Sequence, residues 1–278
     1  MRRRNFLCRA GLAIAGGAAA SGTRAAAAQS ETLLSPTADE ASRVLVTSAG
    51  CNLCHAVAEH LCDSWQVHVT GPVGTDTPFP FKACDLSHDD SLGTLVAGVS
   101  ALVHLALPPP STRGHELIDF RTRQTYNLLR AASRQGVRTV VYLSSLAIML
   151  GYDQRLMVTE DYQPQPTPNA EMLSHYLGEF TCREFARAGE FDVVVLRLGS
   201  LDPSTRATSR GEELPPTTVR DAANAIAAVL ERAKDGNRSG LAPWSVVHIH
   251  SAAQSTRFPL TKARRLLDFR PLPLEATP

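Results

Sequence analysis

Short apolar strands alternate with helix-forming segments along most of this 278-residue chain, and this alternation constrains the fold more than any other feature. Runs such as VRTVVYL at residues 137–143 and FDVVVL at residues 191–196 are apolar at nearly every position, so both faces of these strands must be covered. Predicted strands cover residues 44–46, 67–69, 81–84, 101–106, 137–143, 191–196 and 245–249; predicted helices cover 53–61, 88–97, 114–135, 170–188, 218–234 and 260–267. We therefore expect an α/β fold, a doubly wound parallel sheet with helices on both faces and a small C-terminal appendage.

Residues 1–28 have the composition of an export signal. A charged start of the twin-arginine kind, Arg2 to Arg4, is followed by an Ala- and Gly-rich apolar tract and by small residues suited to cleavage. We expect this twin-arginine signal to carry the protein across the cytoplasmic membrane, to the periplasm or another extracytoplasmic space. Residues 29–42 are then a linker, 43–200 one nucleotide-binding-type domain, and 201–278 a short C-terminal substrate-type region.

The charge balance and the hydropathy point neither to nucleic acid as a partner nor to a membrane span after the signal. The chain has 28 Lys and Arg residues against 27 Asp and Glu residues, so no basic surface is expected for nucleic acid. After residue 28, no apolar run reaches the ~18 residues that a membrane-spanning helix needs. The oligomeric state stays open.

The stretch VLVTSAGCNLCH at residues 44–55 ends in the C-x-x-C-H pattern of covalent haem attachment, with Cys51, Cys54 and His55 as its reactive residues. We do not expect haem, because the motif lies at a strand–loop–helix junction. In addition, the twin-arginine route carries folded proteins, whereas haem attachment needs an unfolded chain. The motif therefore calls for another explanation.

Several other roles for these cysteines stay open. Cys51 and Cys54 can form a structural disulfide or a catalytic redox pair, since the dipole of a helix that starts near Leu53 would lower a thiol pKa. They can equally be small buried thiols. A zinc site made by Cys51, Cys54, His55 and either His60 or Cys62 would lack the second paired cluster of structural zinc sites, so no metal is expected.

Seven stretches, in order and at suitable spacing, resemble a known family. They are VLVTSAGCNLCHAVAEHL from residue 44, Cys84–Leu86, Val103–Ala106, Thr125–Leu129, Val141–Ser145, Ser174–Glu179 and Leu196–Gly199. Together they resemble the extended short-chain dehydrogenases/reductases, the NAD-dependent epimerase/dehydratase group, with compact members such as the uronate dehydrogenases as the nearest kind. The resemblance implies a Rossmann-like domain, NAD(P) as the cofactor, and a nucleotide-like or sugar-like small molecule as the ligand.

The glycine loop of this family is altered here. The three glycine positions hold Ser48, Cys51 and Cys54, and each added Cβ either disfavours a positive φ or pushes a phosphate away. The second strand ends at residues 69–71 without an acidic residue for the ribose hydroxyls. The resemblance places cofactor contacts at Ser48, Gly50, Cys51, Asn52, Leu53, Asp85, Leu86, Leu105 and Ala106. We expect binding there to be weakened or lost.

The catalytic residues of the family are replaced as well. The resemblance puts Glu171 at the position of the catalytic Tyr, His175 at that of the Lys and Leu146 at that of the Ser or Thr, with Ser145 adjacent. None of the five tyrosines is followed four residues later by a Lys, so no other alignment restores the pair. The family's Asn is Arg121.

Three functions follow as hypotheses. The first is an exported family member that is catalytically altered or inactive. The second is an active oxidoreductase or epimerase on a sugar or uronate with relocated catalytic groups, of which Glu171 and His175 are candidates because residues four apart share a helix face. The third is a thiol or haem redox protein that uses Cys51 and Cys54.

Overall fold

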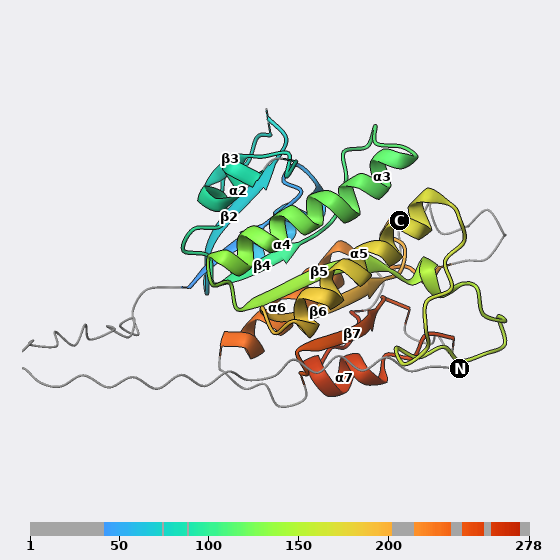
Figure 1. Ribbon diagram of the computed structural model, residues 1–278. Helices are drawn as coiled ribbons and strands as arrows, with labels where there is room; N and C mark the ends of the chain where they lie inside the picture. Colours follow the sequence, from blue (N-terminus) through green and yellow to red (C-terminus); the bar gives the residue numbers. More distant parts are fainter. Residues whose placement is uncertain are drawn as a thin grey trace, which may run out of the picture. The chain divides into compact units, whose positions relative to one another are not determined.

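The computed structural model describes residues 42–73, 75–87, 89–201, 214–234, 241–252 and 257–272 (Figure 1). The expected signal at residues 1–28 and all of the expected linker except Ser42 lie outside the described residues, as do parts of the expected C-terminal region. Among the described residues, no helix combines the length and the apolar character that crossing a membrane requires.

Seven parallel strands form one sheet. They are β1 (Arg43–Val46), β2 (Gln66–Gly71), β3 (Phe81–Ala83), β4 (Ala101–His104), β5 (Thr139–Ser145), β6 (Asp192–Leu198) and β7 (Trp244–Ile249). Their order is β3-β2-β1-β4-β5-β6-β7, and every pair is parallel. The predicted doubly wound, Rossmann-like sheet is confirmed. The strand order reverses between β1 and β4, the point at which such sheets bind their ligands.

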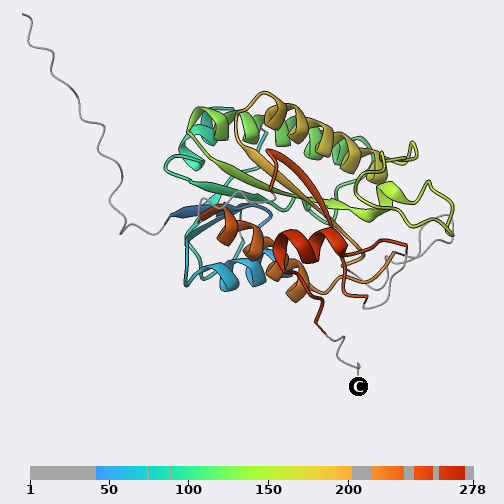
Figure 2. The same cartoon turned by 90° about the horizontal axis from the view of Figure 1, so that it is seen from below.

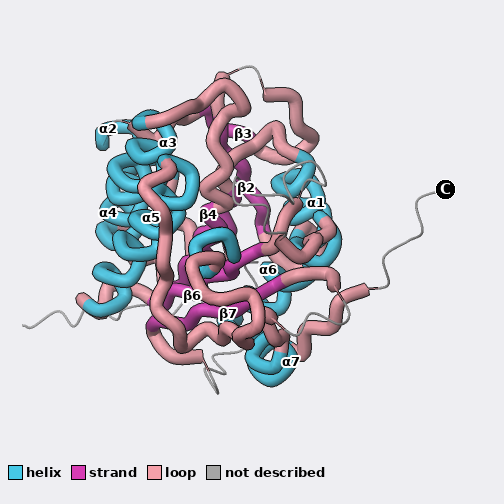
Figure 3. The backbone as a smooth tube through the Cα atoms, turned by 90° about the vertical axis from the view of Figure 1, so that its right-hand side faces the viewer, coloured by secondary structure: helices cyan, strands magenta, loops and turns pink. Residues whose placement is uncertain are grey.

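Helices cover both faces of this sheet (Figures 2 and 3). One face carries α2 (Asp89–Leu95), α3 (His115–Asp119), α4 (Thr125–Arg134) and α5 (Ala170–Arg187), and the other carries α1 (Asn52–Leu61), α6 (Val219–Lys234) and α7 (Thr261–Leu267). A π-helical turn η1 (Phe120–Gln124) joins α3 to α4, and a 3-10 turn η2 (Leu146–Met149) follows β5. The long helix predicted at 114–135 is thus present, but it widens at η1.

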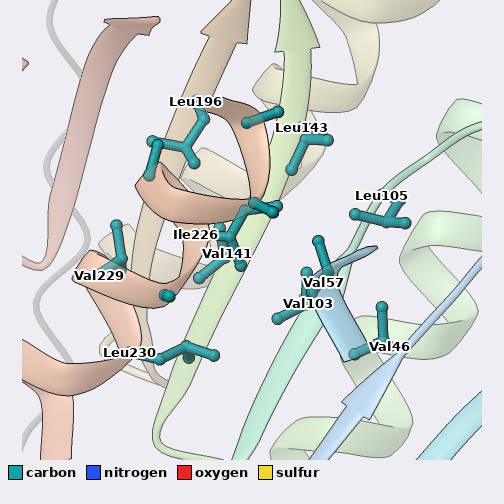
Figure 4. Close-up of a cluster of buried hydrophobic side chains, with 14 of the residues drawn as sticks. Val46, Val57, Val103, Leu105, Val141, Leu143, Leu196, Ile226, Val229 and Leu230 are labelled. Carbon is teal, nitrogen blue, oxygen red and sulfur yellow. The ribbon is translucent and has the colours of Figure 1, made fainter. Parts of the chain in front are cut away.

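The core lies between the sheet and its two helical layers because successive strand side chains point to opposite faces. In β1, Val44 and Val46 pack toward α1 and α6, whereas Leu45 packs toward α2 and α4. Figure 4 shows how Val46 and Val141 of the strands meet side chains of α1 and α6. Each fully buried Val or Leu stabilises the fold by about 1.5–3 kcal/mol.

Part of the segment after residue 200 belongs to the same sheet. β7 pairs with β6 along its whole length, and α6 packs against α1. The region expected to be an appendage of its own therefore contributes a strand and a covering helix to the layered unit. The strand predicted at 101–106 is shorter than expected, since Ala106 has a φ of +52°, which an extended strand cannot continue through.

Gly178 permits close packing between α5 and β5. A Cβ at this position would collide with the hydroxyl of Tyr142 and lie 2.9 Å from the carbonyl oxygen of Arg121. We expect Gly178→Ala to lower the free energy of unfolding by about 1–3 kcal/mol in urea titrations, although Ala is the better helix former. The Tyr142 hydroxyl has no hydrogen-bond partner among the described residues, so Tyr142→Phe should recover part of the loss.

Gly93 in α2 provides the matched control for this prediction. A Cβ there would meet nothing within 4 Å, so Gly93→Ala should stabilise the protein by up to about 1 kcal/mol. Equal stabilisation by both Gly→Ala changes would contradict the close approach of α5 to Tyr142.

Candidate functional site

A cavity of about 910 Å³ lies at the carboxyl ends of β1, β2 and β4, beside the point where the strand order reverses. Its wall comes from the loop after β1, the ends of β2 and β3, the segment after β4, and the helix formed by α3 and η1. The lining residues include Thr47–Asn52, Thr70–Pro72, Thr75, Cys84–Leu86, Leu107–Thr112, His115, Glu116, Asp119, Phe120, Arg123 and Gln124. The position agrees with the general rule for open α/β sheets.

The loop after β1 makes the tight turn that brings backbone to the cavity. Ser48 has a φ of +61° and Gly50 a φ of +93°, so two of its residues adopt left-handed conformations. A left-handed residue other than glycine costs about 1–2 kcal/mol. The side chain of Ser48 offsets part of this cost, because its Oγ accepts a hydrogen bond from the amide of Leu107, 3.2 Å away beyond β4.

Cys51 is the N-cap of α1. It has extended backbone angles, and its Sγ accepts a hydrogen bond from the amide nitrogen of Cys54 at 3.3 Å. The N-terminus of a helix is the usual binding site for a phosphate in such folds. Here the thiol of the chain itself takes one of the amides that a phosphate would use.

The two thiols of the C-x-x-C motif are free, as are all the described cysteines, and they are not activated. Burial raises the pKa of Cys51 above its ordinary value, and burial followed by the neighbouring Cys51 raises that of Cys54 to about 12. The expected lowering by the helix dipole is therefore wrong in sign, because desolvation outweighs the backbone hydrogen bonds to the sulfur. The disulfide considered from the sequence is absent from this structure.

The arrangement around the motif also bears on the metal and haem hypotheses. Cys54 packs in the hydrophobic core, whereas the half-exposed His55 has its Nε2 atom 3.2 Å from a carboxylate oxygen of Glu59. A haem bound to both cysteines would have to enter the core. Among the described residues, no three His, Cys, Asp or Glu side chains come together in a way that could hold a metal ion.

These burial differences predict the order of alkylation by iodoacetamide at about pH 8. Exposed Cys62 should react first, and buried Cys54 and Cys182 at least about tenfold more slowly, since the thiolate is the reactive form. The rate at Cys54 should rise about tenfold per pH unit towards its pKa of about 12. Mass spectrometry of peptides measures the order, and unfolding in guanidinium should equalise the rates. Modification of Cys54 as fast as Cys62 would contradict the burial.

A group of buried apolar side chains follows the carboxyl end of β5. Ser145 ends β5 and caps η2 through a hydrogen bond from the amide of Ala147 at 3.1 Å. We call the next group the sealing cluster: Leu146, Ile148, Met149, Leu150, Val158, Leu214 and Phe258, all buried and packed together. Met172 and Tyr176 of α5 pack against it, and none of its residues lines the cavity.

Arg121 closes the space between β4 and α5. Its guanidinium is buried, donating from Nε to the carbonyl of Ala106 at 3.2 Å and from Nη1 to Oγ of Ser174 at 2.9 Å. The residue lies on the π turn η1, which places its side chain against α5. In the sequence, Arg121 was noted only because it stands where the family has an Asn. Nothing in the sequence indicated that its side chain joins Ala106 to Ser174.

Comparison with known proteins identifies the chain. The family model of the NAD dependent epimerase/dehydratase family matches residues 47–236, more than half of the chain. The chain belongs to this family. The resemblance inferred from the sequence is thereby confirmed, and the family to which it belongs is NAD-dependent.

Individual relatives of this chain are distant. Uronate dehydrogenase of Pseudomonas syringae pv. tomato (strain ATCC BAA-871 / DC3000) is 25% identical over 122 residues, 44% of this chain and 44% of that enzyme. This chain thus spans less than half the length of the curated relative that it matches.

Solved structures confirm the fold. Uronate dehydrogenase from Agrobacterium tumefaciens has a TM-score of 0.67 at 22% identity, over 84% of this chain and 85% of that one, and a mutant of it was solved with NAD. Glucuronic acid dehydrogenase from Chromohalobacter salexigens has a TM-score of 0.66 at 20% identity, over 84% and 85% of the two chains. A UDP-galactose 4-epimerase has a TM-score of 0.64 at 19% identity, over 82% and 93%.

The structure places the residues at the catalytic positions of the epimerase/dehydratase family outside the cavity wall. Glu171 is exposed at the start of α5, whereas His175, one turn later, is buried. Burial, reinforced by the nearby Arg121 charge, holds the pKa of His175 well below its usual range, so its imidazole is neutral. Leu146 belongs to the sealing cluster, and Ser145 is used as a cap. None of these four residues lines the cavity.

The structure divides the cofactor residues expected from the family into two groups. Ser48, Gly50, Cys51, Asn52, Asp85 and Leu86 line the cavity, whereas Leu53, Leu105 and Ala106 are buried and do not. Sequence reasoning missed the wall made by α3, η1 and the segment after β4. The run Pro108–Pro110 was the available signal, because it directly follows a buried strand and so had to lie at the ligand edge of the sheet.

The NAD that the family implies can be tested against these residues. The β1–β2 side offers an open cavity of suitable position for one nucleoside. On the β5–β6 side the sealing cluster and the Arg121 bridge are buried, and the imidazole nitrogen Nδ1 of His175 has no hydrogen-bond partner among the described residues. The described residues that line the cavity therefore fit the nucleoside end of the cofactor that the family implies.

Proposed function

We propose that this protein is an exported, ligand-binding member of the epimerase/dehydratase family that does not transfer hydride. The observation that carries the proposal is the pair of residues at the family's Tyr and Lys positions. Moving a hydride at a carbinol carbon needs a group that holds or releases the hydroxyl proton beside it. Glu171 lies in solvent and His175 is enclosed and neutral, so neither supports that role.

A spectrophotometric assay tests the proposed absence of hydride transfer. Purified protein is incubated with NAD⁺ or NADP⁺ and either glucuronate or galacturonate, and the absorbance of reduced nicotinamide is followed; conversion of UDP-galactose is measured separately. We expect no turnover above a blank. Turnover that disappears in the variant Glu171→Ala would instead support an oxidoreductase with relocated catalytic groups.

Ligand binding in the cavity is tested by blocking it. Thr75 lies in the cavity wall, so the larger side chain of Thr75→Trp should fill the cavity. The variant should lose binding of adenosine and of adenine nucleotides, measured by titration calorimetry. Val73 is a neighbouring residue that is 89% exposed and outside the wall, so Val73→Trp is the matched control and should leave binding unchanged. Equal loss in both variants would contradict the cavity as the binding site.

Export is proposed from residues 1–28, whose twin-arginine pattern supports it. Replacing Arg3 and Arg4 together by Lys should retain the protein inside the cell, measured by fractionation and immunoblotting. Replacing Arg24 by Lys is the control, because it lies outside the twin-arginine stretch. Unchanged export of the double variant would refute this part of the proposal.

A further inference from the structure

The two cysteines of the C-x-x-C stretch lie in the first turn of α1. Cys51 is the N-cap of this helix, and Cys54 follows three residues later. Residues three apart in a helix are neighbours on one face, with about 5–6 Å between their Cβ atoms. Because each Cα–Cβ bond is tilted toward the start of the helix, the side chain of Cys54 is directed back toward Cys51.

The contacts of the two residues bring their side chains together. Cys51 Sγ lies 3.3 Å from the amide nitrogen of Cys54, and this nitrogen is bonded to the Cα atom that carries the second thiol. Both residues pack against the same hydrophobic core, and both line a small cavity of about 150 Å³ beside the loop after β1. A disulfide needs Cβ atoms about 3.5–4.5 Å apart, so a small shift of this turn, for which the cavity leaves room, allows the bond.

The other described cysteines lie in different places. Cys62 is at the far end of α1, eight residues after Cys54, which corresponds to about 12 Å along the helix axis. Cys84 and Cys182 pack against the core on the opposite face of the sheet. Among the described cysteines, Cys51 and Cys54 are therefore the two that share one helical turn and one face of the sheet.

We propose that Cys51 and Cys54 form a reversible disulfide in the folded protein, by exchange with a small-molecule disulfide such as oxidised glutathione. Cys51 reacts first, because it is partly exposed and borders the 910 Å³ cavity. Its sulfur bonds to one sulfur of oxidised glutathione, and the other sulfur leaves as reduced glutathione. Cys54 then attacks Cys51 Sγ and releases the second glutathione. Two protein thiols are thus oxidised, one glutathione disulfide is reduced, and the two thiol protons pass to the two leaving thiolates.

Burial of the two thiols favours the disulfide once it has formed. Burial raises the pKa of Cys51, and burial followed by the neighbouring Cys51 raises that of Cys54 to about 12. A dithiol pair is easily reduced when the protein stabilises a thiolate, and here the thiolates are destabilised. The same burial makes exchange slow at neutral pH, because the thiolate is the attacking form. The chemistry does not depend on the proposed function, although export would bring the pair into an oxidising space.

Equilibration with mixtures of reduced and oxidised glutathione tests the proposal. The full chain is quenched with acid, alkylated under denaturing conditions and cleaved after glutamate. The peptide that ends at Glu59 contains Cys51 and Cys54 but not Cys62, so mass spectrometry measures the pair separately. We expect the equilibrium constant for disulfide formation to be at least tenfold larger in the folded protein than in the same chain unfolded in guanidinium, about 1.4 kcal/mol. An equal or smaller constant in the folded protein would overturn the proposal.

Three variants test the order of the two steps. Cys54→Ala should accumulate a glutathione adduct on Cys51, because the second nucleophile is missing. Cys51→Ser should acquire at least about tenfold less glutathione on Cys54, which is 3% exposed. The matched control Cys62→Ser should leave the disulfide and its equilibrium constant unchanged, since Cys62 is exposed at the other end of α1. Equal glutathione uptake by Cys51→Ser and Cys54→Ala, or loss of the disulfide in Cys62→Ser, would contradict the proposal.

Discussion

Lowering the pH from about 7.5 to about 5 is expected to reduce the free energy of unfolding by several kcal/mol, through histidines that are buried and neutral in the folded protein. Burial, with a further contribution from the Arg121 charge, lowers the pKa of His104 from 6.5 to about 3. The pKa values of His175 and His248 are held well below the usual range, first by burial and then by nearby cations.

The sign follows from proton binding in the two states. Between pH 6.5 and about 3 the unfolded chain binds a proton at His104 and the folded protein does not, so stability is present above pH 6.5 and is lost as the pH falls below it. At pH 5 this loss amounts to about 2 kcal/mol for His104 alone. His175 and His248 act in the same direction.

Urea unfolding at a series of pH values, with two variants, measures this effect. Neither ring nitrogen of His248 has a hydrogen-bond partner among the described residues, so His248→Leu should be neutral or stabilising at pH 7 and should flatten the acid decline. Exposed His60 serves as the matched control, and His60→Leu should leave the decline unchanged. A stability that stays constant from pH 7.5 to 5 would contradict the burial of all three imidazoles.

Breaking the ion pair between Glu179 of α5 and Arg197 of β6 is expected to cost about 3–5 kcal/mol of stability. The two side chains are 5% and 3% exposed and make two hydrogen bonds, at 2.8 and 2.7 Å. Glu179→Gln leaves the buried guanidinium of Arg197 without a counter-charge, and a charge enclosed without a partner is strongly unfavourable. Urea titration at pH 7.5 measures the loss.

Two further variants show whether burial is the cause. Replacing both partners, by Glu179→Leu and Arg197→Met together, should recover much of the stability, because no unpaired charge remains. On the same helix, Glu184 pairs with Arg187, which is 76% exposed, and Glu184→Gln should cost less than about 1 kcal/mol. A similar cost for Glu179→Gln and Glu184→Gln would be inconsistent with a buried pair.

The sequence predicted the fold well because the relevant signals are local. A run such as VRTVVYL is apolar on both faces whatever its neighbours are, so it had to be a covered strand. The sequence also predicted correctly that Glu171 and His175 lie one turn apart on the same helix, because this follows from their spacing of four residues. The absence of a Tyr followed by a Lys needed only the list of tyrosines.

The candidate site was only partly predictable. The loop residues Ser48 and Cys51 were correctly placed at a turn after the first strand, and both line the cavity. The thiol pKa was predicted with the wrong sign, because the helix dipole is visible in the sequence but the burial of Cys54 in the hydrophobic core is not. The Arg121 bridge was missed for the same reason: Ser174 lies 53 residues away in the chain.

The sequence by itself determined a parallel sheet, the place of the loop after its first strand and the absence of any Tyr followed four residues later by a Lys, because periodicity and residue identity act within a few residues. Only the tertiary structure decided that the loop after β1, the end of β2 and the segment after β4 line one cavity. Leu146, Val158, Leu214 and Phe258 meet in the sealing cluster from four separate segments. Burial and charge at a site depend on such distant neighbours, and they decide what a cavity can hold.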